Sequence, residues 1–355
     1  MQSGNKAYRG GRGKPLSARR GFSFFPGEEK ERDCAPARPA YNAGLPMQYR
    51  TLGKTGLSVS ALAFGGSSLG GAFGPIDETE AIRAVHEALE GGINLIDTAP
   101  YYGATRAETV LGRALRGIGR DRYHLATKVG RYGPEAFDFS AARTLASVDE
   151  SLARLGVDHV DLIQVHDLEF GDPAQIVHET LPALARVREA GKARFIGITG
   201  LPIARLLEVL DQAGEAVEVI QSYCHYCLND TALADAVPRL REAGVGLISS
   251  APLAMRLLSD AGPPEWHPAP PLLKEKCAEA ARYCREQGME IGRLALQFAL
   301  ANTEIHAHVV GMADPRCVVE NLRHAAEPPD ETVLAGVLHI LEPVHNLTWP
   351  SGKPR

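Results

Sequence analysis

The chain has 355 residues, 45% of them hydrophobic, and a formal net charge of -5 at pH 7. Its length allows one large core or two smaller ones, and no apolar run approaches the roughly 18 to 20 residues that span a bilayer. The weakly acidic balance gives no sign of a nucleic-acid partner. We therefore expect a soluble protein without a membrane or nucleic-acid partner.

Residues 1–46 differ in charge from the rest of the chain. They contain nine Lys and Arg residues against four Asp and Glu residues, and the first acidic residue is Glu28. Because they lack the apolar spacing of a helix, we predict a disordered basic extension, with an organelle transit peptide or a gene-model artefact as the alternatives. The six cysteines are scattered and no secretory signal is visible, which favours reduced thiols in the cytoplasm.

From about Met47, short apolar runs alternate with amphipathic stretches. Asp77 with Glu80 three residues later predicts a capped helix over 77–90, and Ser140 predicts the cap of a second helix over 140–155. The predicted strands are Ala61–Gly65, Asn94–Asp97, His124–Lys128, Val160–Gln164, Arg194–Thr199, Val219–Ser222, Gly246–Ser250 and His308–Val310.

Strands that alternate with helices indicate a parallel sheet, and eight such units match a closed (β/α)₈ barrel. The alternative is an open doubly wound sheet, but no G-x-G-x-x-G turn follows the first strand. We therefore predict a barrel over residues 47–349 and a short tail over 350–355. Residues 253–273 are Pro-rich and predict a long loop at the barrel mouth. The segment 327–355 is expected to wrap the outside.

Polar side chains stand at the ends of three consecutive predicted strands. Asp97 closes the second strand, Lys128 closes the third, and His166 follows the fourth, while Tyr101 and Tyr102 come shortly after Asp97. Barrel enzymes take their catalytic groups from these carboxyl ends. We therefore expect one mouth to hold a carboxylate, a phenol, an ammonium and an imidazole.

This combination suits proton transfer to or from a carbonyl or alcohol oxygen. A free phenol titrates near 10, and we expect the Lys128 ammonium to lower the pKa of the tyrosine. Asp97 would hold Lys128 as an ion pair, and a neutral His166 would orient the substrate oxygen. Each residue alone also has a structural explanation, such as a loop cap, rim packing or a solvated charge. The four together, in strand order, favour catalysis.

The segment YRTLGKTGLSVS at 49–60, then FGG at 64–66 and DTAPYYG at 97–103, resembles the opening of aldo-keto reductases. The resemblance covers about residues 47–349 and implies a (β/α)₈ TIM barrel of the aldo-keto reductase type. It also implies a catalytic tetrad, which falls on Asp97, Tyr102, Lys128 and His166. The family spacing of five residues after the aspartate selects Tyr102 rather than Tyr101.

Further segments resemble the plant L-galactose dehydrogenase subgroup of that family: FIGITGLP at 195–202, QSYCHY at 221–226, SSAPLAM at 249–255, PPEWHP at 263–268 and NLTWPSG at 346–352. This resemblance implies oxidation of L-galactose at C1 to L-galactono-1,4-lactone, on the route to ascorbate. The alternatives are a dehydrogenase of another aldose such as L-fucose or D-arabinose, a carbonyl reductase, and a cofactor-sensing binding subunit.

The family resemblance also implies a nicotinamide dinucleotide across the barrel mouth. Many relatives have Asn at the position of Gly200 and a stacking aromatic at that of Ser250, so ring contacts must differ here. Relatives that prefer NADP place cations at the positions of Gly311 and Cys317, which predicts NAD rather than NADP. The cofactor-binding residues implied are Gly66, Ser67, Thr199, Gln221, Ser250, Ala251, Leu253, Gly311, Arg316, Glu320 and Asn321.

Sugar hydroxyls need polar partners, because a site built to bind a hydroxyl rejects analogues without it. The candidates near the mouth are Tyr132, Asp167, Glu169, Tyr226 and Trp266. Trp266 either stacks on a sugar face or packs its own loop. Asp167 and Glu169 either bind hydroxyls or lie as rim charges exposed to water.

We predict no metal site. Cys224, His225 and Cys227 form a C-H-x-C pattern, but strand alternation would turn these ligands to opposite faces, and there is no second half-site. A redox-sensitive thiol at Cys224 is the alternative. His306 and His308 share one face of the last strand and are expected to be structural.

Overall fold

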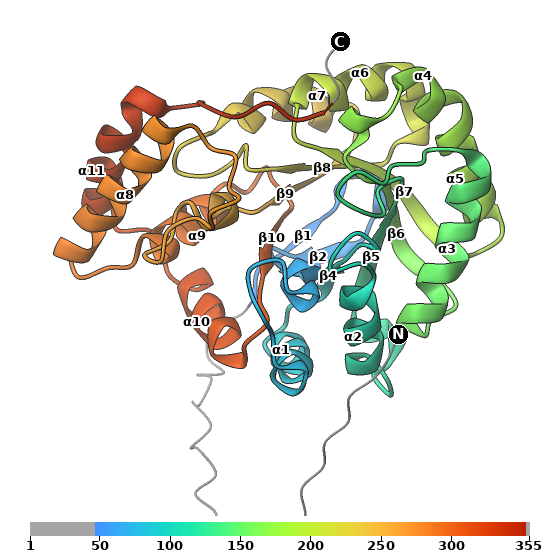
Figure 1. Cartoon of the computed structure of the whole chain (residues 1–355), viewed down its shortest axis with the longest axis horizontal. Coiled ribbons are helices and arrows are strands. Elements are labelled where there is room, and N and C mark those ends of the chain that lie inside the picture. Colours follow the sequence, from blue (N-terminus) through green and yellow to red (C-terminus); the bar gives the residue numbers. More distant parts are fainter. Residues whose placement is uncertain (1–46, 353–355) are drawn as a thin grey trace, which may run out of the picture. The chain divides into compact units, whose positions relative to one another are not determined.

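A computed structural model describes residues 47–352, so the predictions for residues 1–46 and for 353–355 lie outside the described range. Eight parallel strands close into a barrel in the order β10-β3-β4-β5-β6-β7-β8-β9 (Figure 1). They are β3 Leu62–Gly65, β4 Leu95–Asp97, β5 His124–Val129, β6 Val160–Val165, β7 Ala193–Gly200, β8 Val219–Tyr223, β9 Gly246–Ser250 and β10 Ala307–Gly311. Every predicted strand is present, so the (β/α)₈ barrel is confirmed and the open sheet is wrong.

Helices follow the strands around the barrel (Figure 1). They are α1 Glu78–Glu90, α2 Arg106–Ala114, α3 Ala141–Leu155, α4 Pro173–Gln175, α5 Leu181–Glu189, α6 Ile203–Ala213, α7 Val237–Glu242, α8 Pro271–Glu286, α9 Ile291–Ala301, α10 Pro315–Ala325 and α11 Glu331–Leu341. Both predicted caps are confirmed: Asp77 accepts from the N–H groups of Thr79 and Glu80, and Ser140 accepts from that of Arg143. Within 47–352, no helix is long and apolar enough to cross a membrane.

A two-stranded antiparallel hairpin precedes the barrel, formed by β1 Tyr49–Thr51 and β2 Ser58–Ser60. Its turn donates a hydrogen bond from Lys54 N to Gly244 O at 2.7 Å, next to the start of β9. A Cβ at Gly53 would lie 2.3 Å from Gly246 N, so only glycine permits this approach. The hairpin therefore closes the end of the barrel at which the strands begin. The hairpin was not among the predicted elements.

The barrel interior and the layer outside it are separate apolar regions. Side chains such as Ala63, Leu95, Leu162 and Ile248 fill the interior together with Leu52 of the hairpin. The alternate residues of the strands point outward and pack against the helices. This alternation leaves the carboxyl ends of the strands as the place where polar side chains gather.

The two irregular segments lie at the mouth and beside it. Residues 253–273 form the predicted loop, with one short 3-10 turn at Ala254–Arg256 before α8 begins. The segment after residue 327 is not simply a wrapping tail, because it contains α11, which packs beside α8 (Figure 1). Beyond α11 the chain reaches the mouth, where the Ser351 hydroxyl donates to Glu169 Oε1 at 2.8 Å. The barrel mouth thus includes part of the predicted tail.

Candidate active site

The four residues of the predicted tetrad come from three neighbouring strands. Asp97 is the last residue of β4, Lys128 lies near the end of β5, and His166 directly follows β6. Tyr102 lies in the turn between β4 and α2. Because the strands are parallel and hydrogen-bonded in this order, their carboxyl ends bring the four side chains to one mouth.

The Lys128 ammonium is at the centre of this group. Its Nζ lies 2.6 Å from Asp97 Oδ1, 2.8 Å from Thr98 O and 3.2 Å from the Tyr102 hydroxyl. Lys128 is 1% exposed, and burial alone would lower its pKa, but the charges of Asp97 and Tyr102 outweigh burial and raise it. The amine therefore stays charged beside the phenol, as a buried cation does only when it is paired.

The pKa of Tyr102 differs from the sequence expectation. Lys128 does lower this pKa, as predicted, but desolvation is larger and Asp97 adds to it, so the pKa rises to about 12. The prediction of a net decrease in this pKa is wrong, because the sequence does not reveal how strongly the folded mouth excludes water from the phenol. In this state the hydroxyl remains protonated near neutral pH.

His166 lies on the other side of Tyr102. The two rings are 5.6 Å apart at 90°, and His166 Nε2 is 3.7 Å from Asp167 Oδ2. Burial lowers the pKa of His166 to about 3, so the ring is neutral. Its Nδ1 has no hydrogen-bond partner among the described residues. A neutral imidazole of this kind can orient an oxygen without competing for the proton.

Gln164 extends the network beyond the tetrad. This inward-facing residue of β6 donates from Nε2 to Asp97 Oδ2 at 3.3 Å and to Gln221 Oε1 at 2.7 Å. Gln221 in turn donates from Nε2 to Ser250 Oγ at 2.7 Å. Gln164 was not among the predicted site residues, although its place two residues before His166 puts it on the same face of the chain.

The residues predicted to bind a cofactor lie along the same mouth. Gly66 and Ser67 follow β3, and Thr199 on β7 pairs in register with Gln221 on β8. Ser250 ends β9, and Ala251 and Leu253 come directly after it. Gly311 ends β10, while Arg316, Glu320 and Asn321 belong to α10. Eight of these residues therefore lie at or near the carboxyl ends of β3, β7, β8, β9 and β10, and the other three lie on the helix that follows β10.

Arg316 has an acidic partner. Its Nη2 lies 2.8 Å from Asp314 Oδ2 and its Nε lies 3.3 Å from Oδ1. Asp314 also caps α10 by accepting from Arg316 N at 2.8 Å, and the hydrogen bonds from Arg316 lower the pKa of this carboxyl. Asp314 was not among the predicted site residues, although Asp directly before Pro315 is a common helix-cap signal.

Asp167 and Glu169 are not rim charges in water, because both are buried, at 3% and 4% exposure. Asp167 forms an ion pair with Arg131, whose guanidinium lies 3.9 Å from the centre of the Tyr101 ring. The pKa of Glu169 rises to about 7, first through burial and second through the charge of Asp167. Arg131 was not among the predicted site residues, although it follows Lys128 by only three positions.

Two of the predicted sugar-binding tyrosines point elsewhere. Tyr132 lies under the guanidinium of Arg143 on α3, and its hydroxyl accepts from Gly130 N at 3.1 Å. Tyr226 stacks on Phe298 of α9 at 5.6 Å and 12° and contacts His308. Both rings therefore pack against side chains of outer helices, and their role in sugar binding stays a prediction.

Trp266 lies on the loop over the mouth. It is 55% exposed, with its ring 6.0 Å from that of Phe73 and 6.2 Å from that of His267. The same loop donates from Arg256 Nη1 to Phe73 O at 3.4 Å. The loop after β9 thus meets the loop after β3, and Trp266 keeps an open face.

The C-H-x-C segment has ordinary structural contacts. His225 Nδ1 lies 2.9 Å from Asp230 Oδ2, and Cys227 Sγ lies 3.4 Å from Cys224 O. Within 47–352, no cluster of His, Cys, Asp and Glu has the arrangement of a metal site. Burial raises the pKa of the Cys224 thiol, which disfavours the reactive thiolate and argues against the redox hypothesis.

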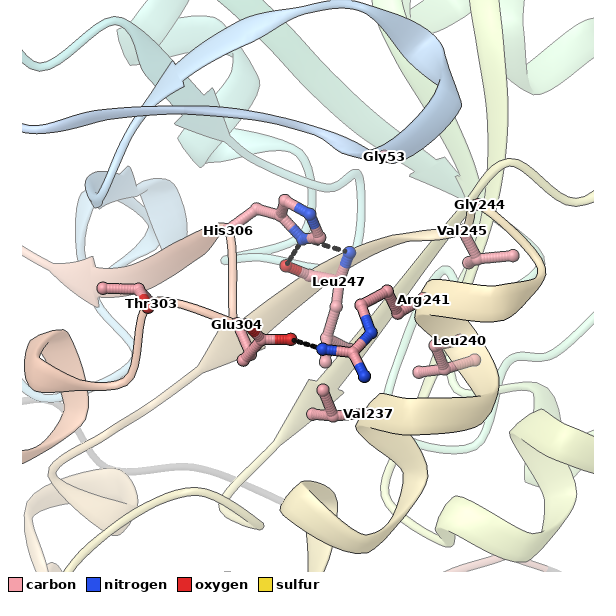
Figure 2. A pocket seen from close by; sticks show the side chains of 10 residues that line it. All are labelled: Gly53, Val237, Leu240, Arg241, Gly244, Val245, Leu247, Thr303, Glu304 and His306. Carbon is pink, nitrogen blue, oxygen red and sulfur yellow. Dashed lines mark hydrogen bonds and ion pairs between the residues drawn. The ribbon is translucent and has the colours of Figure 1, made fainter.

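A hollow of about 210 Å³ lies at the opposite end of the barrel, where β9 and β10 begin, and Figure 2 shows the side chains that line it. Arg241 and Glu304 form an ion pair at 2.9 Å across it, and His306 Nδ1 accepts from Leu247 N at 3.0 Å. Its polar groups are therefore paired with one another, and the tetrad lies at the other end. This hollow is not the candidate active site.

The aldo/keto reductase family model matches residues 61–339. The chain belongs to the aldo/keto reductase family. This aldo-keto reductase is 51% identical over 313 residues to L-galactose dehydrogenase of Arabidopsis thaliana, covering 86% of this chain and 98% of the relative. It is 34% identical over 259 residues to D-arabinose 1-dehydrogenase of Saccharomyces cerevisiae, covering 69% and 76%.

Among solved structures, the aldo-keto reductase resembles AKR11C1 from Bacillus halodurans in its holo form. The TM-score is 0.69 with 29% sequence identity, covering 86% of this chain and 99% of that one. These likenesses confirm the family resemblance stated from the sequence. They also agree with the parallel barrel described above.

Aldo-keto reductases use nicotinamide cofactors, and the donor set at this mouth fits such a group. Thr199 and the Glu169 carboxylate stand at the end of β7 with hydroxyl and carboxylate groups that suit an amide. The Asp314 carboxylate at the amino end of α10 can accept a hydrogen bond from a ribose hydroxyl of a dinucleotide. The residues present are therefore compatible with the cofactor of this aldo-keto reductase.

Proposed function

We propose that this enzyme oxidises L-galactose at C1 to the lactone, with NAD as the hydride acceptor. The observation that supports this most directly is the contact of Lys128 Nζ with both Asp97 at 2.6 Å and the Tyr102 hydroxyl at 3.2 Å. The sugar assignment rests on the 51% identity to the Arabidopsis L-galactose dehydrogenase, which covers nearly the whole of that protein.

In the proposed reaction, the phenolate form of Tyr102 accepts the proton of the anomeric hydroxyl as hydride leaves C1. Bound NAD supplies the hydride acceptor and brings a positive charge to the mouth. Lys128 holds the phenol in position and opposes the burial that raises the pKa of Tyr102 to about 12. Neutral His166 orients the reacting oxygen, and Asp97 fixes Lys128. Held geometry of this kind supplies much of an enzyme's rate enhancement.

NAD rather than NADP is the proposed cofactor. Asp314 pairs with Arg316 through two contacts, so the cation nearest the expected 2′-phosphate position already has a carboxylate partner. The negative charge of Asp314 also opposes a dianionic phosphate, while it can accept a hydrogen bond from a ribose hydroxyl. We expect kcat/KM to be higher with NAD than with NADP, and a clear NADP preference would contradict the proposal.

Asp167 and Trp266 are the proposed sugar contacts that the geometry still supports. Asp167 lies beside His166 and is charge-paired with Arg131, so a carboxylate and a guanidinium stand together near the reacting oxygen. Trp266 keeps an exposed face on the covering loop. Arg131 therefore joins the predicted residues as a candidate for binding hydroxyls.

A second candidate function is oxidation of another aldose, because the chain is 34% identical to a D-arabinose 1-dehydrogenase. The discriminating experiment follows NADH absorbance with L-galactose, L-fucose and D-arabinose in parallel. We expect the highest kcat/KM with L-galactose. A higher value with another sugar would move the assignment to that sugar, and no turnover with any aldose despite cofactor binding would favour a binding subunit.

A further inference from the structure

One carboxylate oxygen of Glu169 accepts hydrogen bonds from the described protein, and the other accepts none. Its Oε1 accepts hydrogen bonds from Leu201 N at 3.1 Å and from the Ser351 hydroxyl at 2.8 Å. Its Oε2 is buried and has no hydrogen-bond partner among residues 47–352. A buried acceptor without a partner is costly, so it is a group to which a ligand can add a donor.

The unused oxygen lies at the end of β7. A Cβ built on Gly200, the last residue of that strand, would be 2.5 Å from Glu169 Oε2. The carboxylate therefore occupies the space that a side chain at 200 would take. Glycine at this position is what lets the carboxylate reach the strand end beside Thr199.

The side-chain amide of Gln221, on the neighbouring strand, already has hydrogen-bond partners for both of its polar atoms. Thr199 pairs in register with Gln221 on β8. Gln221 Oε1 already accepts from Gln164, and Gln221 Nε2 already donates to Ser250. At this part of the mouth, Glu169 Oε2 is thus an acceptor without a partner among the described residues, and a ligand N–H or O–H group can donate to it.

We propose that Glu169 Oε2 accepts a hydrogen bond from the carboxamide nitrogen of the nicotinamide ring. The inference rests on the proposed function, because it needs a nicotinamide cofactor in this mouth. It assigns Glu169 to the cofactor rather than to the sugar. Since the oxidised ring is positively charged and the reduced ring is neutral, an ionised Glu169 also favours binding of NAD over NADH.

The contacts of Glu169 define an informative variant. In Glu169→Gln, the amide oxygen must take the place of Oε1, because that position receives two donors, Leu201 N–H and the Ser351 hydroxyl. The NH₂ group must then take the place of Oε2. The variant keeps the shape of the side chain but presents a donor where the wild type presents an acceptor.

The test compares two dinucleotides that differ only at the carboxamide. 3-Acetylpyridine adenine dinucleotide has a methyl group in place of the amide NH₂ and keeps the carbonyl oxygen. Dissociation constants for both dinucleotides are measured by titrating protein fluorescence at a pH above the Glu169 pKa of about 7, where the carboxylate is ionised. The readout is the ratio of the dissociation constant of the analogue to that of NAD. For the wild type we expect the analogue to bind at least about 10-fold more weakly than NAD, as loss of a bond to a charged group implies.

In Glu169→Gln we expect the analogue-to-NAD ratio of dissociation constants to fall to within about twofold of one, because the carboxylate oxygen that accepts from the carboxamide is lost. Gly200→Ala is a second variant, whose Cβ would push Oε2 aside, and it should reduce the ratio in the same direction. Glu135→Gln, at an exposed position of the loop after β5, removes a carboxylate charge without altering Glu169 or Gly200 and should leave the ratio unchanged. Circular dichroism and thermal melting check that each variant is folded.

The outcomes separate this inference from the proposed function. If the wild type binds NAD and oxidises the sugar, but the ratio stays the same in folded Glu169→Gln and Gly200→Ala, only the inference is overturned. If the wild type binds neither dinucleotide and forms no NADH with any aldose, the proposed function fails and the inference fails with it.

Discussion

The proton affinity of Tyr102 is set by opposing effects that act over a few ångströms. Burial and Asp97 raise the pKa of the phenol, and Lys128 lowers it. Tyr102→Phe removes the acid–base group and keeps the ring that contacts His166. We expect kcat for sugar oxidation to fall by about 100-fold or more, the usual range for acid–base catalysis. Cofactor binding should be retained, and near-normal turnover would contradict the role.

The pH dependence of the reaction tests Lys128 separately. Only the phenolate accepts a proton, so kcat/KM for oxidation should rise with pH. Removing the ammonium in Lys128→Met takes away the effect that lowers the pKa of Tyr102, so the rising part of the profile should move to higher pH. Asp97→Asn removes a charge that raises this pKa and should move the profile the other way. Equal shifts in both variants would refute this electrostatic account.

Single residues show how much of the site could be predicted from the sequence. Asp97, Lys128 and His166 were found because the ends of parallel strands must meet at one mouth, whatever their separation in the chain. The net pKa of Tyr102 was not found, since desolvation depends on packing from the whole mouth. The partner of Glu169 was not found either, because Ser351 lies far away in sequence and the NLTWPSG motif that contains it does not indicate which side chain it contacts.

At the scale of elements, a buried charge network joins β5, α2 and α3. Glu108 is fully buried and accepts from the Thr127 hydroxyl at 2.6 Å and from Arg154 Nε at 2.7 Å. Arg154→Ala would leave the Glu108 carboxylate without its cation. We expect unfolding free energy to fall by about 3 to 5 kcal/mol, because an unpaired buried charge is strongly destabilising.

Denaturant unfolding measures this loss of stability, and two further variants serve as a control and as a rescue. Arg83→Ala removes an exposed ion pair with Glu80 and should cost at most about 1 kcal/mol. Adding Glu108→Gln to Arg154→Ala should recover part of the stability, since the remaining group is neutral. A loss for Arg154→Ala no larger than for Arg83→Ala would show that the network is not stabilised as the contacts suggest.

Elements were predictable where a local signal was strong. The strands were visible as apolar runs, and the caps at Asp77 and Ser140 follow from side chains that bond the first turn of their own helix. The β1–β2 hairpin was missed because its strands have only three residues each and are held by contacts with the distant loop at Gly244. Short strands gain their stability from such partners rather than from their own pattern.

At the scale of the whole molecule, the segment after α11 contacts several of the loops that form the barrel mouth. Asn346 donates from N to Asn229 O and accepts at Oδ1 from Thr231 N, which joins it to the loop after β8. Ser351 then reaches Glu169 in the loop after β6. Between these points, the Trp349 ring contacts His267 of the loop after β9 at 5.1 Å. One segment therefore contacts the loops that follow three different strands.

The two tryptophans of the chain allow this role to be measured. Trp349 is 7% exposed and belongs to the apolar cluster formed with α8, α9 and α11, whereas Trp266 is 55% exposed. Trp349→Ala should lower the unfolding free energy by about 3 to 5 kcal/mol through the cavity it leaves. Trp266→Ala should cost about 0.5 kcal/mol or less, as exposed substitutions usually do. Urea unfolding of both variants decides the matter: similar losses would mean that the segment lies on the barrel without stabilising it, whereas a large loss confined to Trp349→Ala would show that it is part of the folded core.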